Sequence, residues 1–234
     1  MCGRYTIKDP VALAQLIAHL TGEPFAIVAA RYNICPSQSN PVVRPRPEGK
    51  PAATAMRWGL VPRWLQAPTA ADGHANARSE DMFERRSFSE AVQLRRGVAG
   101  ADGFYEWRRL NKRDRIPHHF CLKSRVPFFF GALFEEGVDR PPTYALLTTG
   151  PNALMALIHD RMPVILTGDA LARWLTPGPI SPEEARQICR PFDAGQMEAW
   201  QVSTLVNRPA QDSPDCVAPA SGLPPVDPQG ELFS

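Results

Sequence analysis

The sequence predicts a single α+β domain, built mainly from an antiparallel, barrel-like sheet with short flanking helices. Its 234 residues are enough for one sizeable domain with a core of its own. Short apolar runs separated by proline and glycine dominate the chain, and such runs are typical of strands. Segments with helical periodicity are fewer and short. Hydrophobic residues make up 44% and charged residues 21%, an ordinary composition for a globular protein.

A helix is expected near the start of the chain, over residues 9–20. Asp9 can cap it and Pro10 suits its first turn. Four apolar residues share one of its faces: Leu13, Leu16, Ile17 and Leu20. Three shorter helices are expected later in the chain, over 152–158, 168–175 and 181–190.

The expected strands are apolar runs bounded by turn residues. They are NPVVRP (40–45), AATAMRW (52–58), GVAGADGFYEW (97–107), HHFCLK (118–123), VPFFFGALF (126–134), TYALLTT (143–149) and MPVIL (162–166). The domain predicted from these elements spans residues 2–207. Residues 208–234 are rich in proline and small polar residues, so we expect a loosely packed or disordered tail there.

Several proline-flanked stretches mix an aromatic or apolar anchor with polar groups, which is typical of loops that carry a site. They are RYNICPSQ (31–38), WGLVPRW (58–64), HANARSE (74–80), DGFYEW (102–107) and IHDRMP (158–163).

Composition also excludes some classes of protein. No apolar run approaches the roughly 20 residues of a membrane span, and the chain start lacks the features of a secretion signal. We therefore expect a cytoplasmic protein without membrane contact. The five cysteines are odd in number and lack CxxC spacing, which argues against a disulfide framework and a structural zinc site. His118 and His119 would point to opposite faces of a strand, so they do not form a ligand pair. No metal and no cofactor are expected.

The formal net charge of +2 neither indicates nor excludes a nucleic-acid partner. Arginine is frequent in four charged stretches: RPRPEGK, FERRSF, QLRRG and EWRRLNKRDR. A solvated face explains most of these, and a track for phosphate groups is the alternative.

Seven motifs occur in a fixed order along the chain: MCGRYT, RYNICPSQ, RWGLVPRW, NARSE, ADGFYEW, LLTTGPNALMALIHDRMPVIL and VSTLVN. Together they resemble the SRAP family, named for SOS-response-associated peptidases, from residue 2 to about residue 207. This family includes proteins that shield abasic sites in DNA. The resemblance implies a compact α+β fold around a barrel-like sheet. It also implies that Met1 is removed and that Cys2 crosslinks to the aldehyde of an abasic site in single-stranded DNA, forming a thiazolidine. Proteolytic activity, at least to release the first residue, is a separate proposal within the family.

The position of Cys2 suits this chemistry. A terminal cysteine carries a free α-amine with a pKa near 8 beside a thiol with a pKa near 8.5. The amine can condense with an aldehyde to a Schiff base, and the thiol can then close a five-membered ring. An internal cysteine has no free amine. Without the other motifs, a cysteine in second place would be an accident of sequence.

Three further residues are candidates for catalysis. Glu106 stands among aromatic residues, where desolvation would raise its pKa; alone, it would be a carboxylate on a strand surface. His159 could shuttle a proton, or it could be a histidine bonded to a carbonyl at a helix end. The resemblance maps the family's active-site glutamate, histidine and asparagine onto Glu106, His159 and Asn76. Asn76 could instead be an ordinary turn residue.

Five residues are candidates for DNA contact. Arg4 and Arg78 match the family's phosphate-contacting arginines, though each could form a surface salt bridge. Trp64 is a candidate platform on which a base stacks. Pro36, beside Asn33, could wedge against an exposed base edge or serve turn packing.

Three functions follow from these residues. The first is a monomeric protein that covalently caps abasic sites in single-stranded DNA and associates with the nucleoid when bound. The second is a cysteine peptidase with Cys2 as nucleophile, His159 as base and Asn76 as orienting residue. The third is a non-covalent binder of single strands. Cys35 stands where many members of the family have a small residue; it lacks an amine and should not form a thiazolidine.

Overall fold

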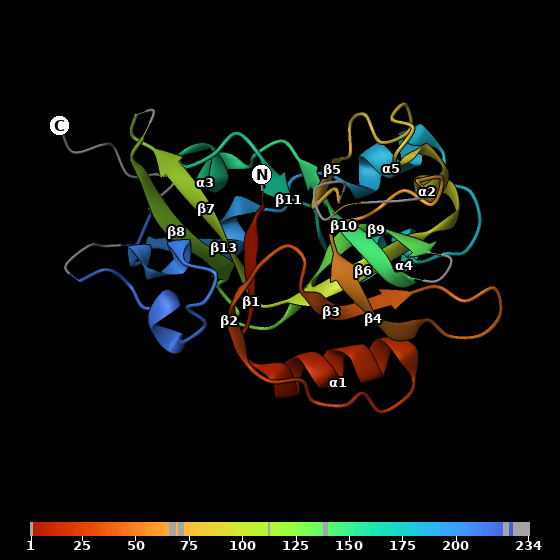
Figure 1. Ribbon diagram of the computed structural model, residues 1–234, viewed down its shortest axis with the longest axis horizontal. Helices are drawn as coiled ribbons and strands as arrows, with labels where there is room; N and C mark the ends of the chain where they lie inside the picture. The colour runs from red at the N-terminus through yellow and green to blue at the C-terminus, as the bar shows by residue number, and fades with distance from the viewer. Residues whose placement is uncertain are drawn as a thin grey trace.

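Two sheets form the core of the protein (Figure 1). The computed structural model describes residues 2–65, 69, 73–111, 113–137, 140–221 and 225–226. No helix among these residues has the length and apolar character that crossing a membrane requires.

Five strands close into a barrel. They are β3 (Ser39–Arg44), β4 (Ala52–Trp58), β6 (Arg96–Ala101), β9 (Phe128–Gly137) and β10 (Arg140–Thr149). The pairing runs β10–β4–β3–β6–β9 and returns from β9 to β10. The β10–β4 pair is parallel and the other four pairs are antiparallel. The predicted barrel-like α+β architecture is therefore confirmed. Three short strands extend the barrel: β5 (Asn76–Arg78), β11 (Met162–Pro163) and β12 (Ile165–Leu166).

The second sheet has the order β13–β8–β7–β1–β2, and every neighbouring pair is antiparallel. Its strands are β1 (Arg4–Ile7), β2 (Arg31–Ile34), β7 (Gly103–Arg109), β8 (Arg115–Leu122) and β13 (Met197–Gln201). Strands β7 and β8 form a hairpin that carries the arginine-rich EWRRLNKRDR stretch.

An aromatic cluster joins the two sheets. The ring of Tyr5 on β1 lies 5.2 Å from that of Trp58 and 5.8 Å from that of Phe130, both in the barrel. The hydroxyl groups of Tyr5 and Tyr144 lie 2.9 Å apart and form a hydrogen bond. All four side chains are buried. This packing fixes β1, and with it the start of the chain, against the barrel.

Helices cover the outside of the sheets. They are α1 (Pro10–Thr21), α2 (Ser89–Leu94), α3 (Ala153–Ala156), α4 (Gly168–Trp174) and α5 (Pro182–Ile188). The capping predicted for α1 is confirmed, because Asp9 Oδ1 accepts a hydrogen bond from the Ala12 N–H at 2.9 Å. Leu13 and Ile17 of the predicted apolar face are buried. Helix α2 lacks a capping side chain and was not predicted.

Two sequence predictions differ from the structure. The stretches RYNI and NAR, expected in loops, are the strands β2 and β5. Residues 208–221 are not a loosely packed tail: the Asp212 carboxylate accepts hydrogen bonds from the N–H groups of Tyr32 and Asn33, and Cys216 is fully buried. The prolines of residues 208–221 interrupt helices and strands, but they do not prevent this segment from packing against the rest of the domain. The rest of the predicted tail, apart from residues 225–226, lies outside the described residues.

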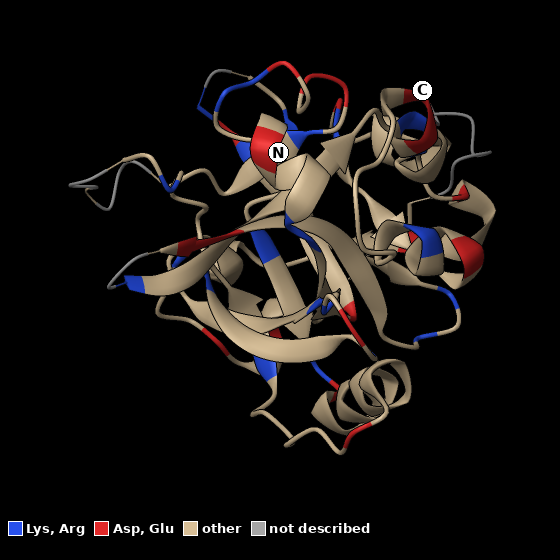
Figure 2. Ribbon diagram, turned by 90° about the vertical axis from the view of Figure 1, so that its right-hand side faces the viewer, with Lys and Arg blue, Asp and Glu red and all other residues tan. Residues whose placement is uncertain are grey.

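Charged residues of both signs are interspersed on the side of the molecule shown in Figure 2. This agrees with the small net charge of +2. Any preference for a polyanion must therefore come from a local group of arginines.

Candidate active site

The start of the chain lies beside the strand that carries Glu106. Strand β1 pairs with β7 in the register Arg4↔Tyr105, so Cys2 lies near the Glu106 end of that pair. Cys2 is completely buried, and its Sγ contacts the carbonyl oxygen of Arg4 at 3.8 Å. Burial and the nearby charge of Glu106 raise the pKa of the Cys2 thiol well above its usual range. The thiol is therefore protonated at neutral pH.

Glu106 is the most strongly perturbed carboxyl group at this site. It is only 2% exposed, and burial raises its pKa to about 7. The acid and the carboxylate are then both populated near neutral pH, as a group that gives and takes protons requires.

His159 faces Glu106 from the segment that follows α3, with 3.8 Å between its Nε2 and Glu106 Oε2. Asn152 caps α3 by accepting a hydrogen bond from the Met155 N–H at 2.8 Å. The Arg161 N–H donates to His159 Nδ1 at 3.0 Å. Asp160 Oδ1 also lies 3.1 Å from Nδ1, and Nε2 is the ring nitrogen that faces Glu106. Burial lowers the pKa of His159, which favours the neutral ring.

Asn76 holds the chain start from the barrel side. It begins β5, and its Nδ2 donates a hydrogen bond to the Cys2 carbonyl oxygen at 2.8 Å. Its Oδ1 is buried and accepts no hydrogen bond from the described residues. A buried carbonyl oxygen without a donor is costly. It is therefore suited to accept a hydrogen bond from a group that enters the site.

Two neighbouring hollows open at this place. One, of about 390 Å³, is lined by Glu106, Trp107, Arg109, Arg115, Ile158, His159 and Asp160. The other, of about 440 Å³, is lined by Arg4, Trp107, Arg113, Arg115 and Asn207. They share Trp107 and Arg115. Of the four sequence-predicted catalytic residues, Glu106 and His159 line the first hollow. Cys2 and Asn76 line neither hollow, but Asn76 is bonded to Cys2 and the charge of Glu106 acts on the Cys2 thiol, so the four residues lie together.

The residues predicted to contact DNA differ in their burial. Arg4 lines the second hollow, and its Nη1 donates to Asn33 Oδ1 at 2.9 Å and to the Val206 carbonyl oxygen at 2.7 Å. Asn33 is completely buried, and its Nδ2 donates to the carbonyl oxygens of Val206, Arg208 and Gln211. In this structure the buried side chain of Asn33 positions the Arg4 guanidinium. The direct DNA contact predicted for Asn33 stays a prediction.

Asn33→Ala should lower the free energy of unfolding by about 3 kcal/mol, because three carbonyl oxygens and the Arg4 guanidinium lose a buried partner. Urea denaturation of the variant and the wild type measures this. An unchanged unfolding free energy together with weaker DNA binding would contradict the positioning role and favour a direct contact.

The other three predicted DNA residues lie at the surface. Pro36 and Arg78 are exposed, and Trp64 is 46% exposed. The Arg86 guanidinium lies 4.3 Å from the centre of the Trp64 ring. Arg78 makes no side-chain hydrogen bond or ion pair with another described residue.

Arg161, Trp107 and Arg115 also belong to the site, although the sequence motifs did not single them out. Arg161 forms two hydrogen bonds to the Glu80 carboxylate, each 2.7 Å long, and a third to the Thr148 carbonyl oxygen. It thereby fixes the segment that carries His159. Each of the three lies in a stretch that the sequence already marked. Arg161 lies in the candidate site loop IHDRMP, and Trp107 and Arg115 lie in the arginine-rich stretch EWRRLNKRDR.

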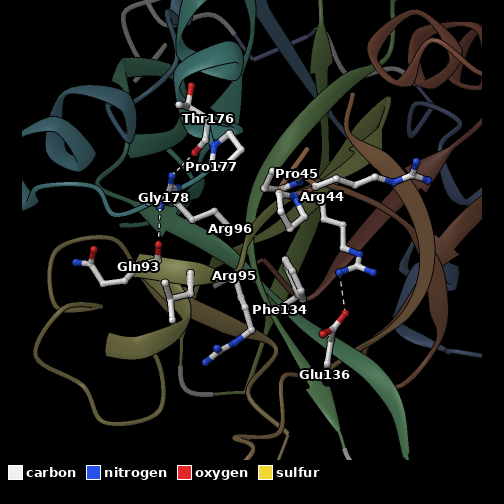
Figure 3. Close-up of a pocket in the computed structure, with 13 residues that line it drawn as sticks. Arg44, Pro45, Gln93, Arg95, Arg96, Phe134, Glu136, Thr176, Pro177 and Gly178 are labelled. Atoms are coloured by element: carbon white, nitrogen blue, oxygen red, sulfur yellow. Dashed lines mark hydrogen bonds and ion pairs between the residues drawn. The ribbon is translucent and has the colours of Figure 1, made fainter. Parts of the chain in front are cut away.

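A further hollow, of about 310 Å³, is also lined by arginines (Figure 3). These arginines already have partners. Arg44 Nη1 lies 2.7 Å from Glu136 Oε1, Arg95 pairs with Glu135, and Arg96 donates to five backbone carbonyl oxygens. This hollow therefore offers much less uncompensated positive charge than the arginines on the β7–β8 hairpin.

Comparison with known proteins places the chain among its relatives. A family model described as SOS response associated peptidase (SRAP) matches residues 1–209. The abasic site processing protein YoqW of Bacillus subtilis (strain 168) is 36% identical over 225 residues, which cover 93% of this chain and 99% of that protein. The abasic site processing protein HMCES of Rattus norvegicus is 29% identical over 240 residues, 85% of this chain and 67% of that protein.

The fold has a counterpart among solved structures. The crystal structure of a protein from Bacteroides thetaiotaomicron matches with a TM-score of 0.80 and 23% sequence identity, over 94% of this chain and 100% of that chain. At this identity the likeness concerns the fold alone.

Proposed function

Because the chain belongs to the SRAP family, we propose that it processes abasic sites in single-stranded DNA through a covalent bond to Cys2. The convergence of Cys2, Glu106, His159 and Asn76 supports this proposal most directly. Relatives named abasic site processing proteins, up to 38% identical, support the substrate.

The proposed reaction begins with hydrolysis of the Met1–Cys2 peptide bond, which consumes one water and frees the Cys2 amine. That amine attacks the aldehyde of the ring-opened sugar, and loss of one water gives a Schiff base. The Cys2 sulfur then bonds to the imine carbon, and the thiol proton passes to the nitrogen. The product is a thiazolidine with the mass of protein plus DNA minus one water. A thiol that is protonated at neutral pH carries the proton that this last step needs.

Glu106 and His159 supply the proton transfers in this proposal. Opening of the sugar ring, loss of water and ring closure each need a proton donor or acceptor beside the sugar. Glu106 can serve as both near neutral pH because its pKa is raised to about 7. Nε2 of His159 faces Glu106, so a proton can pass between the two groups in this proposal. Asn76 Oδ1 is suited to accept a hydrogen bond from the Cys2 amine.

The DNA strand needs contacts beyond the lesion. We assign Arg78 and Arg4 to backbone phosphates and Trp64 to stacking with a flanking base, which is worth about 1–3 kcal/mol per base. Pro36 is exposed and can contact a base edge.

A peptidase acting on other polypeptides is less well supported. A cysteine nucleophile reacts as the thiolate, and its pKa is normally lowered. Burial and Glu106 instead raise the pKa of Cys2. Turnover of an added peptide by protein that has lost Met1 would favour this second function.

The test is the intact mass of the protein before and after incubation with a single-stranded oligonucleotide that carries one abasic site. We expect the protein alone to have lost the mass of one methionine residue. We expect a denaturation-resistant species with the mass of protein plus DNA minus water. Trimmed protein that forms no such species would overturn the proposal and leave the peptidase or the non-covalent binder.

A further inference from the structure

The β7–β8 hairpin carries four exposed arginines beside the candidate active site: Arg108, Arg109, Arg113 and Arg115. None of them forms a side-chain hydrogen bond or ion pair with another described residue. Arg109 and Arg115 are directly opposite each other in the antiparallel register. Like charges in this position repel each other and destabilise a sheet. The hairpin therefore presents positive charge that the described part of the chain does not balance.

Three of these four exposed arginines line the hollows at the candidate site. Arg109 and Arg115 line the hollow that contains Glu106 and His159, and the charge of Arg109 contributes to the lowered pKa of His159. Arg113 and Arg115 line the adjoining hollow together with Arg4. Two acidic side chains share the first hollow: Glu106, which is buried, and Asp160, which is 88% exposed and lies 3.1 Å from His159 Nδ1.

The pleat of the sheet places these groups in one row. Arg4 pairs with Tyr105, and Trp107 and Arg109 follow at intervals of two residues along β7. Side chains two residues apart point to the same face of a strand, and paired residues share that face. Arg4, Trp107, Arg109 and Arg115 therefore lie along one face of the second sheet, which runs to the tip of the hairpin. Glu106, between Tyr105 and Trp107, belongs to the opposite face by the same rule, and it shares with Arg109 and Arg115 the hollow described above.

We propose that three arginines of the hairpin, Arg109 and Arg115 on this face and Arg113 in the turn, bind backbone phosphates of the lesion-bearing strand on one side of the abasic nucleotide. The inference rests on the proposed function and adds a second binding surface to it. Arg78 and Trp64 belong to β5 and to the segment after β4, whereas the three hairpin arginines belong to β7, to β8 and to the turn between them. A strand held by both sets runs through the site, so the lesion is bound inside a strand and not at its end.

The test compares two variants that lose equal charge. The hairpin variant is Arg109→Gln with Arg115→Gln. The control variant is Arg46→Gln with Arg186→Gln, which lie in the segment after β3 and on α5. Removing a like-charged pair should leave the hairpin folded. Arg113→Gln, in the turn, serves as a second and milder hairpin variant.

The first readout is equilibrium binding of an undamaged, fluorescently labelled single-stranded oligonucleotide over a range of salt concentrations. The logarithm of the binding constant should fall with the logarithm of salt less steeply for the hairpin variant, by about 0.7 for each phosphate that the variant no longer neutralises. The control variant should keep the wild-type slope. Equal slopes for all proteins, or equal changes in both double variants, would overturn the proposal.

The second readout is the rate of covalent adduct formation on oligonucleotides that end at the abasic nucleotide on the 5′ or on the 3′ side. The truncated oligonucleotide that lacks the phosphates bound by the hairpin should slow adduct formation by the wild type to the rate of the hairpin variant. The same truncation should not change the rate of the hairpin variant, which no longer uses those phosphates. A hairpin defect that persists on both truncated strands would contradict the proposed contact. Failure of any adduct to form in the wild type would overturn the proposed function, while the binding slopes would still decide the role of the hairpin.

Discussion

Replacing Cys2 by alanine is expected to abolish the denaturation-resistant adduct with abasic DNA. The variant keeps an α-amine once Met1 is removed, so it can still form a Schiff base, but it lacks the sulfur that closes the ring. An imine alone is readily hydrolysed. Gel electrophoresis under denaturing conditions, with trimmed wild-type protein alongside, measures the difference. We expect at least a 100-fold loss of stable adduct.

The same variant offers an internal control. Cyanoborohydride reduces a Schiff base to a stable amine, so Cys2→Ala should regain an adduct when this reductant is present during incubation. The hydroxyl of Cys2→Ser closes the ring less effectively than the thiol. This variant should therefore also need the reductant to form a stable adduct. Undiminished stable adduct in Cys2→Ala without reductant would contradict the role of the sulfur. No adduct with reductant, in correctly trimmed protein, would contradict the role of the amine.

The fold was predictable because its signals are local. Strands β3, β4, β8, β9 and β10 overlap predicted apolar runs, whereas the run 97–107 divides into β6 and β7 of different sheets and MPVIL divides into β11 and β12. Strands β1 and β13 were not predicted. Strands β2 and β5 escaped prediction because their sequences, RYNI and NAR, are short and polar. Their strand conformation comes from pairing with β1 and β10, which lie far away in the sequence. Closure of the barrel through the parallel β10–β4 pair depends on equally distant contacts.

The candidate site was predictable in its members but not in its geometry. The motifs, through the resemblance they carry, pointed to Cys2, Asn76, Glu106 and His159. They did not reveal that Asn33 is buried, because a buried asparagine and a DNA-contacting one look alike in the sequence RYNI. Its burial depends on the segment 206–211, almost 180 residues later, which wraps around it. Nor did they reveal that two arginines of EWRRLNKRDR are opposite each other, because that requires the register of the hairpin.

Replacing Glu106 by glutamine should slow adduct formation by about 10²–10⁴-fold at neutral pH, the usual contribution of a general acid–base group. Because the wild-type pKa is raised to about 7, the wild-type rate should change with pH around a midpoint near 7. Glutamine does not titrate, so this dependence should be absent from the variant. Glu106→Asp keeps a carboxyl group on a shorter side chain and should recover part of the rate. A wild-type profile with no change between pH 6 and 8 would contradict the assignment.

The same substitution should stabilise the protein at alkaline pH. Glu106 has an ordinary pKa of 4.5 and a folded-state pKa of about 7, so between these values the folded protein holds a proton that the unfolded chain has released. Stability must then fall as pH rises from 4.5 to 7, by roughly 3 kcal/mol from this group. Glu106→Gln avoids this loss, so its advantage over the wild type in urea denaturation should be larger at pH 8 than at pH 5. The reverse order would mean that the ionised carboxylate stabilises the fold and that its pKa is lowered. A gain in stability together with a loss of rate would show that the buried carboxyl group is kept for its chemistry at a cost to the fold.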